Sequence, residues 1–253
     1  METLGAGLTA RWTRCRRPSA AAAVNLVLLP HAGGSAGFYR AWHELLPREV
    51  ELHVVQYPGR EDRFAEPLVD DMAVLADALA EALAPLFSRP VVLFGHSMGA
   101  SIALEVLRRL EAAGHRPRLL IASGRGAPHR LGPGTLHAAP DDELVEEVRR
   151  QSGSGSAALD DPDLRALLLP MIRSDYRLSE AHRPVGAAPV ATPVAVLRGR
   201  TDTAVTEELA TAWGELTTGG SSQFAFDGGH FYFQGQESRV VATVVDLVHR
   251  AVR

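Results

Sequence analysis

The chain has 253 residues, 46% of them apolar, and a net charge of −4. It is long enough to bury one substantial core, and its charge gives no reason to expect a nucleic-acid partner. All 26 basic residues are arginine, which excludes mechanisms that need a catalytic lysine, and the single cysteine excludes an internal disulfide and a cysteine-rich metal site.

Arginines and an apolar run lie close together near the start of the chain. Arg14, Arg16 and Arg17 precede an apolar stretch at residues 20–29, which looks like the charged and apolar regions of a signal peptide. The stretch is too short to span a bilayer, and residues 24–29 are needed as a core strand. We therefore expect a cytoplasmic protein without a membrane partner.

Short β-rich runs alternate with helical patterns along the chain. Near-continuous apolar runs are typical of strands that are buried on both faces of a parallel sheet. The expected strands are residues 24–29, 52–56, 91–94, 119–122, 194–198 and 223–226. The alternation predicts the α/β class, with a mostly parallel central sheet flanked by helices in a single domain over residues 1–253.

Apolar residues at helical spacing predict the helices between these strands. We expect helices over residues 38–46, over residues that follow a cap at Asp70 or Asp71, over residues 100–113 and over residues 237–252. Gly114 is a plausible glycine stop for the third of these, since glycine permits a left-handed turn.

The strand pattern lapses for about seventy residues between Gly124 and Pro193, too long for a bare connection. Proline and acidic residues at 140–143 and 161–163 predict two helices. Residues 151–156, rich in Gly and Ser, should be a flexible connector, and Pro170 should kink or end the second helix. We expect residues 128–188 to form a helical lid over the carboxyl edge of the sheet; additional core is the alternative.

A candidate nucleophile lies between the expected strand 91–94 and the helix that follows it. Residues 95–99 read Gly-His-Ser-Met-Gly, the pattern of a nucleophile elbow, in which Ser97 occupies a sharp strand-to-helix turn. Glycines two residues on either side are needed because the turn leaves no room for side chains. The sequence therefore predicts an α/β-hydrolase fold with Ser97 as the nucleophile.

A serine nucleophile needs a base, and the base needs an orienting acid. His230 follows the expected strand 223–226, and Asp202 follows the strand 194–198, so both should lie at the sheet edge where Ser97 emerges. Asp227 is the rival acid, although an Asp-Gly pair is also a common turn. A carboxylate from a separate strand end better reaches imidazole Nδ1 while Nε2 faces the serine, which favours Asp202.

The loop at residues 30–34, Pro-His-Ala-Gly-Gly, resembles the loop that supplies one backbone N–H of an oxyanion hole. We expect the backbone N–H groups of Ala32 and Met98 to bind the developing negative oxygen. His31 and His96 are interpreted as structural residues within these turns. This chemistry requires no metal or cofactor.

Five segments together resemble the type II thioesterases, stand-alone α/β-hydrolases that accompany modular polyketide and nonribosomal peptide synthases. They are residues 29–35, 57–63, 95–99, 199–202 and 228–231, of which the Pro-Gly-Arg-Glu motif at residues 58–61 is the most discriminating. Ser97, Asp202 and His230 fall where the catalytic triad of that family lies.

The resemblance implies hydrolysis of acyl thioesters on the phosphopantetheine arm of acyl or peptidyl carrier proteins, which removes aberrant or stalled chains. The phosphopantetheine belongs to the substrate, so no cofactor of the enzyme's own is implied. We expect a monomer that contacts a carrier domain partly through arginines such as Arg60, Arg63 and Arg173; for Arg60 and Arg63, salt bridges within their loop are the alternative.

Other functions fit the same motifs. The alternatives are a chain-releasing thioesterase, with or without cyclisation, a generic carboxylesterase and a non-catalytic hydrolase-fold protein that binds acylated carrier domains. A pure binding protein has no need of a serine, an acid and a histidine at one sheet edge, which argues against the last.

Overall fold

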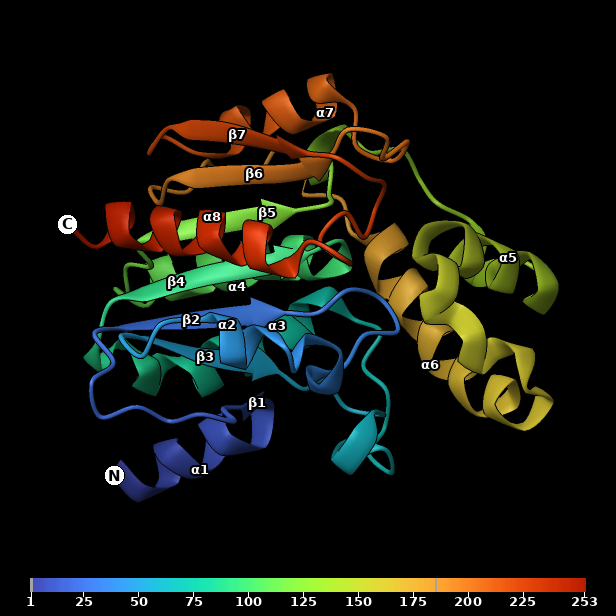
Figure 1. Ribbon diagram of the computed structural model, residues 1–253, viewed down its shortest axis with the longest axis horizontal. Helices are drawn as coiled ribbons and strands as arrows, with labels where there is room; N and C mark the ends of the chain where they lie inside the picture. The colour runs from blue at the N-terminus through green and yellow to red at the C-terminus, as the bar shows by residue number, and fades with distance from the viewer. Residues whose placement is uncertain (1, 185) are drawn as a thin grey trace.

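A mostly parallel sheet forms the centre of the computed structural model, which describes residues 2–184 and 186–253 (Figure 1). Its strands are β1 (Thr13–Arg14), β2 (Val24–Leu29), β3 (Val50–Val55), β4 (Val91–His96), β5 (Leu119–Ser123), β6 (Val194–Gly199) and β7 (Ser221–Phe226). The strand order is β1-β3-β2-β4-β5-β6-β7, and only β1 runs antiparallel to its neighbour. Every residue of β2, β4 and β5 is buried, which explains their continuous apolar sequence. The predicted α/β class is confirmed.

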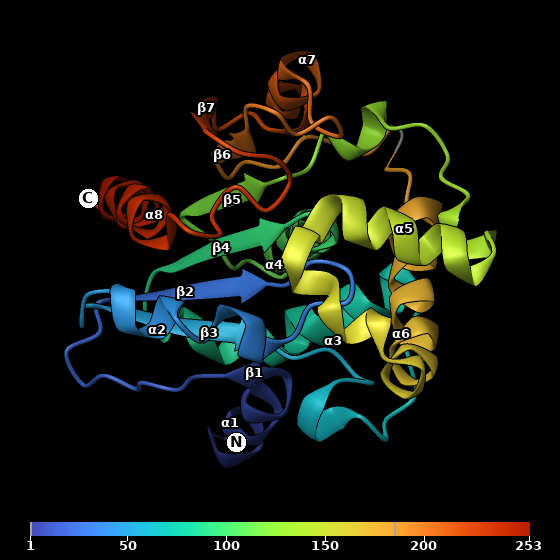
Figure 2. The ribbon, with the colours of Figure 1, turned by 45° about the vertical axis from the view of Figure 1, so that its right-hand side comes forward.

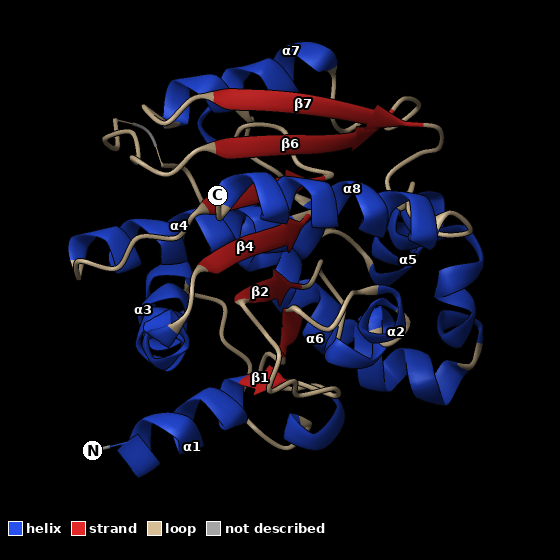
Figure 3. Ribbon diagram, turned by 60° about the vertical axis from the view of Figure 1, so that its left-hand side comes forward, coloured by secondary structure: helices blue, strands red, loops and turns tan. Residues whose placement is uncertain are grey.

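Helices cover both faces of the sheet (Figure 3). One face packs against α3 (Met72–Leu83) and α4 (Met98–Ala112), and the other against α2 (Trp42–Leu45) and α8 (Glu237–Ala251). Asp71, rather than Asp70, caps α3 by accepting a hydrogen bond from the Val74 N–H. Gly114 follows α4 with φ +83°, as a glycine stop requires. Short α7 (Glu207–Thr211) lies between β6 and β7 in the chain.

Two segments near the start of the chain differ from the prediction. The structure adds α1 (Glu2–Trp12) and β1, which pairs with the end of β3. The helix expected at residues 38–46 is shorter than predicted: the α-helix covers only Trp42–Leu45, as α2, and a 3₁₀ helix, η1 (Ala36–Tyr39), precedes it. The backbone N–H groups of Ala36 and Gly37 donate to the side chains of Gln56 and Glu61, so tertiary contacts set this conformation.

A helical insertion lies beyond the carboxyl ends of the central strands (Figures 1 and 2). It contains η4 (Pro128–Arg130), η5 (Leu136–Ala138), α5 (Asp141–Ser152), η6 (Gly153–Asp160) and α6 (Pro162–Ala181). Met1 and Val185 lie outside the described residues. Both belong to the expected domain, and Val185 also belongs to the expected lid. No helix among the described residues has the length and apolar character that crossing a membrane requires.

The insertion differs from its prediction at two points. Residues 151–156 belong to the end of α5 and the start of η6 rather than to an irregular connector. Of the kink or end expected at Pro170, the end is wrong, because α6 continues to Ala181. Leu169, Met171 and Ile172 are buried in a small apolar core of the insertion, and this packing on both sides of the proline offsets the hydrogen bond that it cannot donate.

The close packing around Gly99 of the elbow predicts that a larger residue there will destabilise the fold. A Cβ atom on Gly99 would overlap the carbonyl groups of Leu29 and Pro30, and both obstacles are backbone that cannot rotate away. Gly99→Ala should therefore lower the free energy of unfolding by about 3 kcal/mol or more. Gly7→Ala is the control, because Gly7 is exposed in α1 with no atom near a new Cβ, and alanine there should stabilise by roughly 0.5–1 kcal/mol. Urea unfolding of both variants measures their free energies of unfolding, and equal unfolding midpoints for the two variants would contradict this prediction.

Candidate active site

Ser97 occupies the sharp turn between β4 and α4. Its backbone has φ +55° and ψ −119°, a conformation that residues other than glycine rarely adopt. The Ser97 N–H donates to the Ser123 carbonyl on β5 at 2.7 Å, which fixes the turn against the neighbouring strand. Such a strained, anchored turn presents the hydroxyl at the sheet edge, as a nucleophile elbow does.

His230 joins Ser97 to Asp202. Its Nε2 lies 2.9 Å from the Ser97 hydroxyl, and its Nδ1 lies 2.9 Å from Oδ2 of Asp202. The carboxylate can only accept, so Nδ1 carries the proton and Nε2 is free to accept from the serine. Both the imidazole and the carboxylate are buried, each 8% exposed, whereas Ser97 is partly accessible. The structure thus brings together three side chains from the ends of β4, β6 and β7.

Asp227, the rival acid, lies outside this arrangement. Its side chain is 78% exposed and pairs with Arg200 at 3.3 Å and Arg239 at 3.8 Å. Asp202, by contrast, is fixed in place by a second contact, because its Oδ1 accepts the Ala204 N–H at 2.9 Å. The carboxylate from the separate strand end is the one that orients His230.

The loop at residues 30–34 packs directly against the elbow. Gly99 lies against the carbonyl groups of Leu29 and Pro30, and Leu29 of β2 pairs with Gly95 of β4. Ala32 and Met98 line one cavity together with Ser97 and His230. The two residues whose backbone N–H groups are predicted to form an oxyanion hole therefore share a cavity with the serine.

The cavity above Ser97 has a volume of about 270 Å³. Val148 and Gln151 of α5, and Tyr176, Ser179 and Glu180 of α6, form part of its wall. Arg125, which follows β5, adds a guanidinium group, and burial followed by repulsion from Arg183 lowers its pKa to about 10, so it stays charged at neutral pH. The insertion thus contributes to the wall of a small cavity lined by both apolar and polar side chains.

His31 and His96 are buried beside the site and hydrogen-bonded to side chains of the core. His31 Nδ1 lies 3.0 Å from the Tyr39 hydroxyl, and His96 Nδ1 lies 2.9 Å from the Ser123 hydroxyl. Burial, with a smaller contribution from His230, lowers the pKa of His31 to about 3 and that of His96 well below its ordinary value. Both rings stay neutral at physiological pH, in agreement with the structural role predicted for them.

The low pKa of His31 predicts a loss of stability in acid. Between about pH 6.5 and pH 3 the unfolded chain binds a proton at this ring that the folded chain does not, so stability falls as the pH falls. This one ring should contribute about 1.4 kcal/mol per pH unit below pH 6. His31→Asn, which cannot titrate, should show a shallower decline when urea unfolding is measured from pH 7 to pH 4. An unchanged slope in the variant would contradict this origin.

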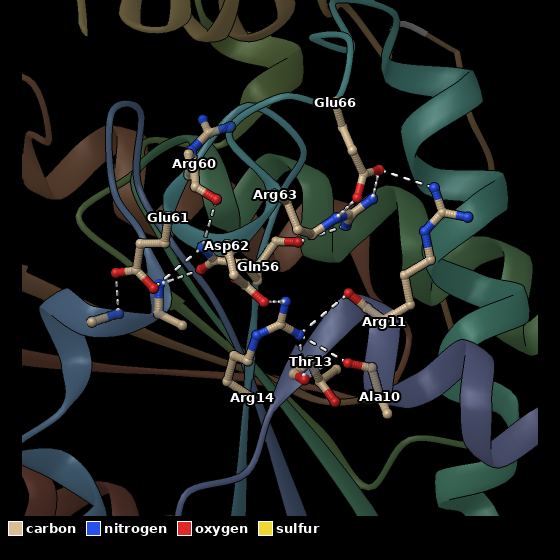
Figure 4. A network of polar contacts seen from close by, with 12 residues as sticks. Ala10, Arg11, Thr13, Arg14, Gln56, Arg60, Glu61, Asp62, Arg63 and Glu66 are labelled. Atoms are coloured by element: carbon tan, nitrogen blue, oxygen red, sulfur yellow. Dashed lines mark hydrogen bonds and ion pairs between the residues drawn. The ribbon is translucent and has the colours of Figure 1, made fainter.

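The arginines expected to contact a carrier domain are engaged within the protein. Arg60 and Arg63 are buried, at 5% and 4% exposure, which leaves neither available to a partner. The alternative of a salt bridge within the loop holds for Arg63, whereas Arg60 pairs with Asp175 of α6. Arg63 pairs with Glu66 at 2.7 Å and lies over the Trp12 ring, within the polar network shown in Figure 4. Arg173 pairs with Asp141 at 2.6 Å. The burial of Arg60 and Arg63 depends on long-range packing that a loop sequence does not reveal.

One cluster among the described residues has the donor atoms of a metal site. Cys15, Glu51 and His53 place ligand atoms within 4.8 Å of one another near the β1 edge of the sheet. Glu51 already accepts the Ser19 N–H at 2.7 Å and lies 3.6 Å from the Arg89 guanidinium, whose positive charge opposes a cation there. These residues do not line the cavity above Ser97.

Comparisons with known proteins agree with this geometry. The thioesterase domain model matches residues 24–251. A probable cadicidin biosynthesis thioesterase of Streptomyces griseus is 40% identical over 240 residues, which cover 95% of this chain and 66% of that protein. Thioesterase PikA5 of Streptomyces venezuelae is 39% identical over 93% of this chain and 84% of its own length.

A solved structure is similar as well. The structure of the type II thioesterase BorB, from the borrelidin biosynthetic cluster, superposes with a TM-score of 0.86 at 39% identity, covering 96% of this chain and 98% of BorB. The chain is a thioesterase of the α/β-hydrolase fold and belongs to the type II thioesterase family.

Proposed function

We propose that the protein removes aberrant or stalled acyl groups from the phosphopantetheine arm of carrier proteins in polyketide or nonribosomal peptide biosynthesis. The observation that carries the proposal is the hydrogen-bonded chain Ser97–His230–Asp202 at the cavity floor of a type II thioesterase. The similarity to PikA5 and BorB supports an editing role beside a modular synthase.

Ser97 would begin the reaction by attacking the thioester carbonyl. His230 Nε2 takes the hydroxyl proton, and Asp202 stabilises the imidazolium that forms. The carbonyl oxygen becomes negative and accepts hydrogen bonds from the N–H groups of Ala32 and Met98. When the tetrahedral intermediate collapses, the C–S bond breaks, His230 returns the proton to the departing pantetheine sulfur, and the acyl group remains on Ser97 as an ester.

Water completes the cycle through the same groups. His230 Nε2 removes a proton from a water molecule, and the resulting hydroxide attacks the acyl-Ser97 carbonyl. The second tetrahedral intermediate uses the same backbone donors. Its collapse breaks the bond to Ser97 Oγ, which regains a proton from His230, and the acyl group leaves as a carboxylic acid. His230 thus handles each proton that moves.

The insertion at residues 128–188 would act as the lid of this site. The contribution of α5 and α6 to the cavity wall supports that role, since their side chains line the same cavity as Ser97. A cavity of about 270 Å³ with the polar side chains of Arg125, Ser179 and Glu180 favours short acyl groups over a full-length chain.

Mass spectrometry of carrier proteins tests the proposed function directly. Acyl or peptidyl carrier proteins loaded with a panel of acyl groups are incubated with the protein, and each should lose the acyl mass while keeping the phosphopantetheine arm. Rates on acyl-pantetheine thioesters should exceed those on simple esters of the same acyl groups. Faster ester cleavage would indicate a carboxylesterase, cyclic products would indicate a chain-releasing thioesterase, and carrier binding without turnover would indicate a binding protein.

A further inference from the structure

A buried ion pair connects the lid helix to the loop that contains Ala32. Arg60, from the loop after β3, pairs through Nη2 with Oδ2 of Asp175 on α6, and both side chains are almost fully buried, at 4% and 7% exposure. The same Asp175 oxygen accepts the Gly33 backbone N–H at 2.7 Å. We propose that Asp175 and Arg60 are positioning residues that hold the oxyanion loop, residues 30–34, in its reactive conformation. This conformation then depends on the position of α6. The inference rests on the proposed role of Ala32 as an oxyanion donor.

Arg60 holds the loop from its other side. Its Nε donates to the Gly34 carbonyl at 2.9 Å, and its Nη1 donates to the Pro58 carbonyl at 2.9 Å. Figure 4 shows the guanidinium of Arg60 turned away from the network formed by Gln56, Glu61 and Arg63. The side chain is therefore committed to the loop and to Asp175, and it fixes a carbonyl only two residues after Ala32.

Ala32 lies between anchored backbone groups. Before it, the Pro30 carbonyl accepts the Tyr57 hydroxyl at 3.2 Å; after it, Gly33 and Gly34 are held by Asp175 and Arg60. An oxyanion donor stabilises the transition state only if it is already aimed at the position of the developing charge. Without the anchors that follow Ala32, the turn around it keeps only the bond from the Gly34 N–H to the His31 carbonyl, at 2.9 Å, so the Ala32 N–H is held less firmly toward that position.

The helix that provides Asp175 also forms the cavity wall. Ile172, one turn earlier on α6, lies against Gly33, where a new Cβ atom would come within 3.2 Å of Ile172 Cγ1. Tyr176, Ser179 and Glu180, which follow Asp175 on α6, line the cavity. One helix thus contacts the space for the acyl group and the loop that stabilises its reaction. A displacement of α6 would open the cavity and release Gly33 together.

Asp175→Asn tests this coupling with little change in side-chain volume. The amide oxygen can still accept the Gly33 N–H, but the charge that holds Arg60 is gone. We expect kcat on an acyl-pantetheine thioester to fall about 10- to 100-fold, with KM changed less than about threefold, because loss of a whole oxyanion donor costs on the order of 10²–10³. The affinity for a boronic acid whose tetrahedral adduct with Ser97 mimics the oxyanion should fall by a similar factor.

Asp70→Asn is the matched control. Asp70 pairs at 3.1 Å with Arg177, also on α6, but both of these side chains are about half exposed. Its kcat should stay within about twofold of the wild type. If Asp175→Asn does not fold, Arg60→Lys is the second variant: it keeps the charge beside Asp175 but cannot bridge to the Gly34 carbonyl as well, and kcat should again fall while KM holds.

The outcomes separate this inference from the proposed function. The positioning role would be overturned by a folded Asp175→Asn variant whose kcat is unchanged, whose only change is in KM, or whose boronate affinity is unchanged. An equal loss of kcat in Asp70→Asn would also overturn it, since that loss would reflect the lid helix in general. Wild-type protein that does not hydrolyse acyl-pantetheine or acyl-carrier thioesters would instead refute the proposed function.

Discussion

Ser97→Ala should reduce kcat for acyl-pantetheine hydrolysis by about 10⁴- to 10⁶-fold. The hydroxyl is the group of the hydrogen-bonded chain that is proposed to bond to the acyl carbon, and removal of such a nucleophile leaves only the contribution of the backbone donors and of substrate binding. The fold should persist, because the elbow is held by backbone contacts to Ser123 and Ala100 rather than by the side chain. Steady-state kinetics with unfolding curves for both proteins measures the two effects.

Ser35→Ala is the control for this substitution. Ser35 follows the loop at residues 30–34, and its hydroxyl donates to Glu61 at 2.7 Å without lining the cavity. Its kcat should remain within about threefold of the wild type. A Ser97→Ala protein that retains more than about one per cent of wild-type kcat would show that another group takes the acyl chain.

Asp202→Asn should reduce kcat by about 10⁴-fold. An amide can present its N–H₂ group to Nδ1 of His230, which favours the tautomer with the proton on Nε2, where it can no longer accept from Ser97. The buried imidazolium that forms during the reaction also loses its counter-charge. Because the geometry is otherwise kept, KM should change far less than kcat.

Asp227→Asn separates the two acids that the sequence offers. Asp227 is three residues before His230, but its carboxylate points to Arg200 and Arg239 at the surface. Its removal should change kcat by no more than about twofold. If the two variants behaved in the opposite way, the acid of the site would be Asp227 and the observed contact between Asp202 and His230 would not be the one used in the reaction.

Local sequence patterns predicted the parts of this fold that local physics determines. The runs that became β2, β4 and β5 are apolar at every or nearly every position because both faces of each strand are covered. The strained turn at Ser97 shows in the sequence as glycines on both sides, and the ends of parallel strands bring Asp202 and His230 to the same edge. To predict these features, it is enough to know where the strands lie in the sequence and that they run parallel.

The features that the sequence did not predict depend on contacts between distant residues. Residues 38–46 carry a helical pattern, but η1 begins before them, where the backbone N–H groups of Ala36 and Gly37 donate to the side chains of Gln56 and Glu61. Pro170 predicts a kink or an end of the helix, and α6 continues past it, with buried neighbours on both sides of the proline. Asp175 lies 115 residues from Arg60, so neither its burial nor its bond to Gly33 leaves a local trace. Its place in the site is visible only in three dimensions.

Covalent trapping tests the role of Ser97 most directly. A fluorophosphonate with a short acyl-like chain is incubated with the wild-type protein and with Ser97→Ala, and digestion followed by mass spectrometry locates the adduct. We expect one phosphonylated peptide, modified at Ser97, complete loss of thioesterase activity in proportion to labelling, and no adduct in the variant. Labelling at another residue, or labelling of the variant at the wild-type rate, would contradict the assignment of Ser97 as the nucleophile.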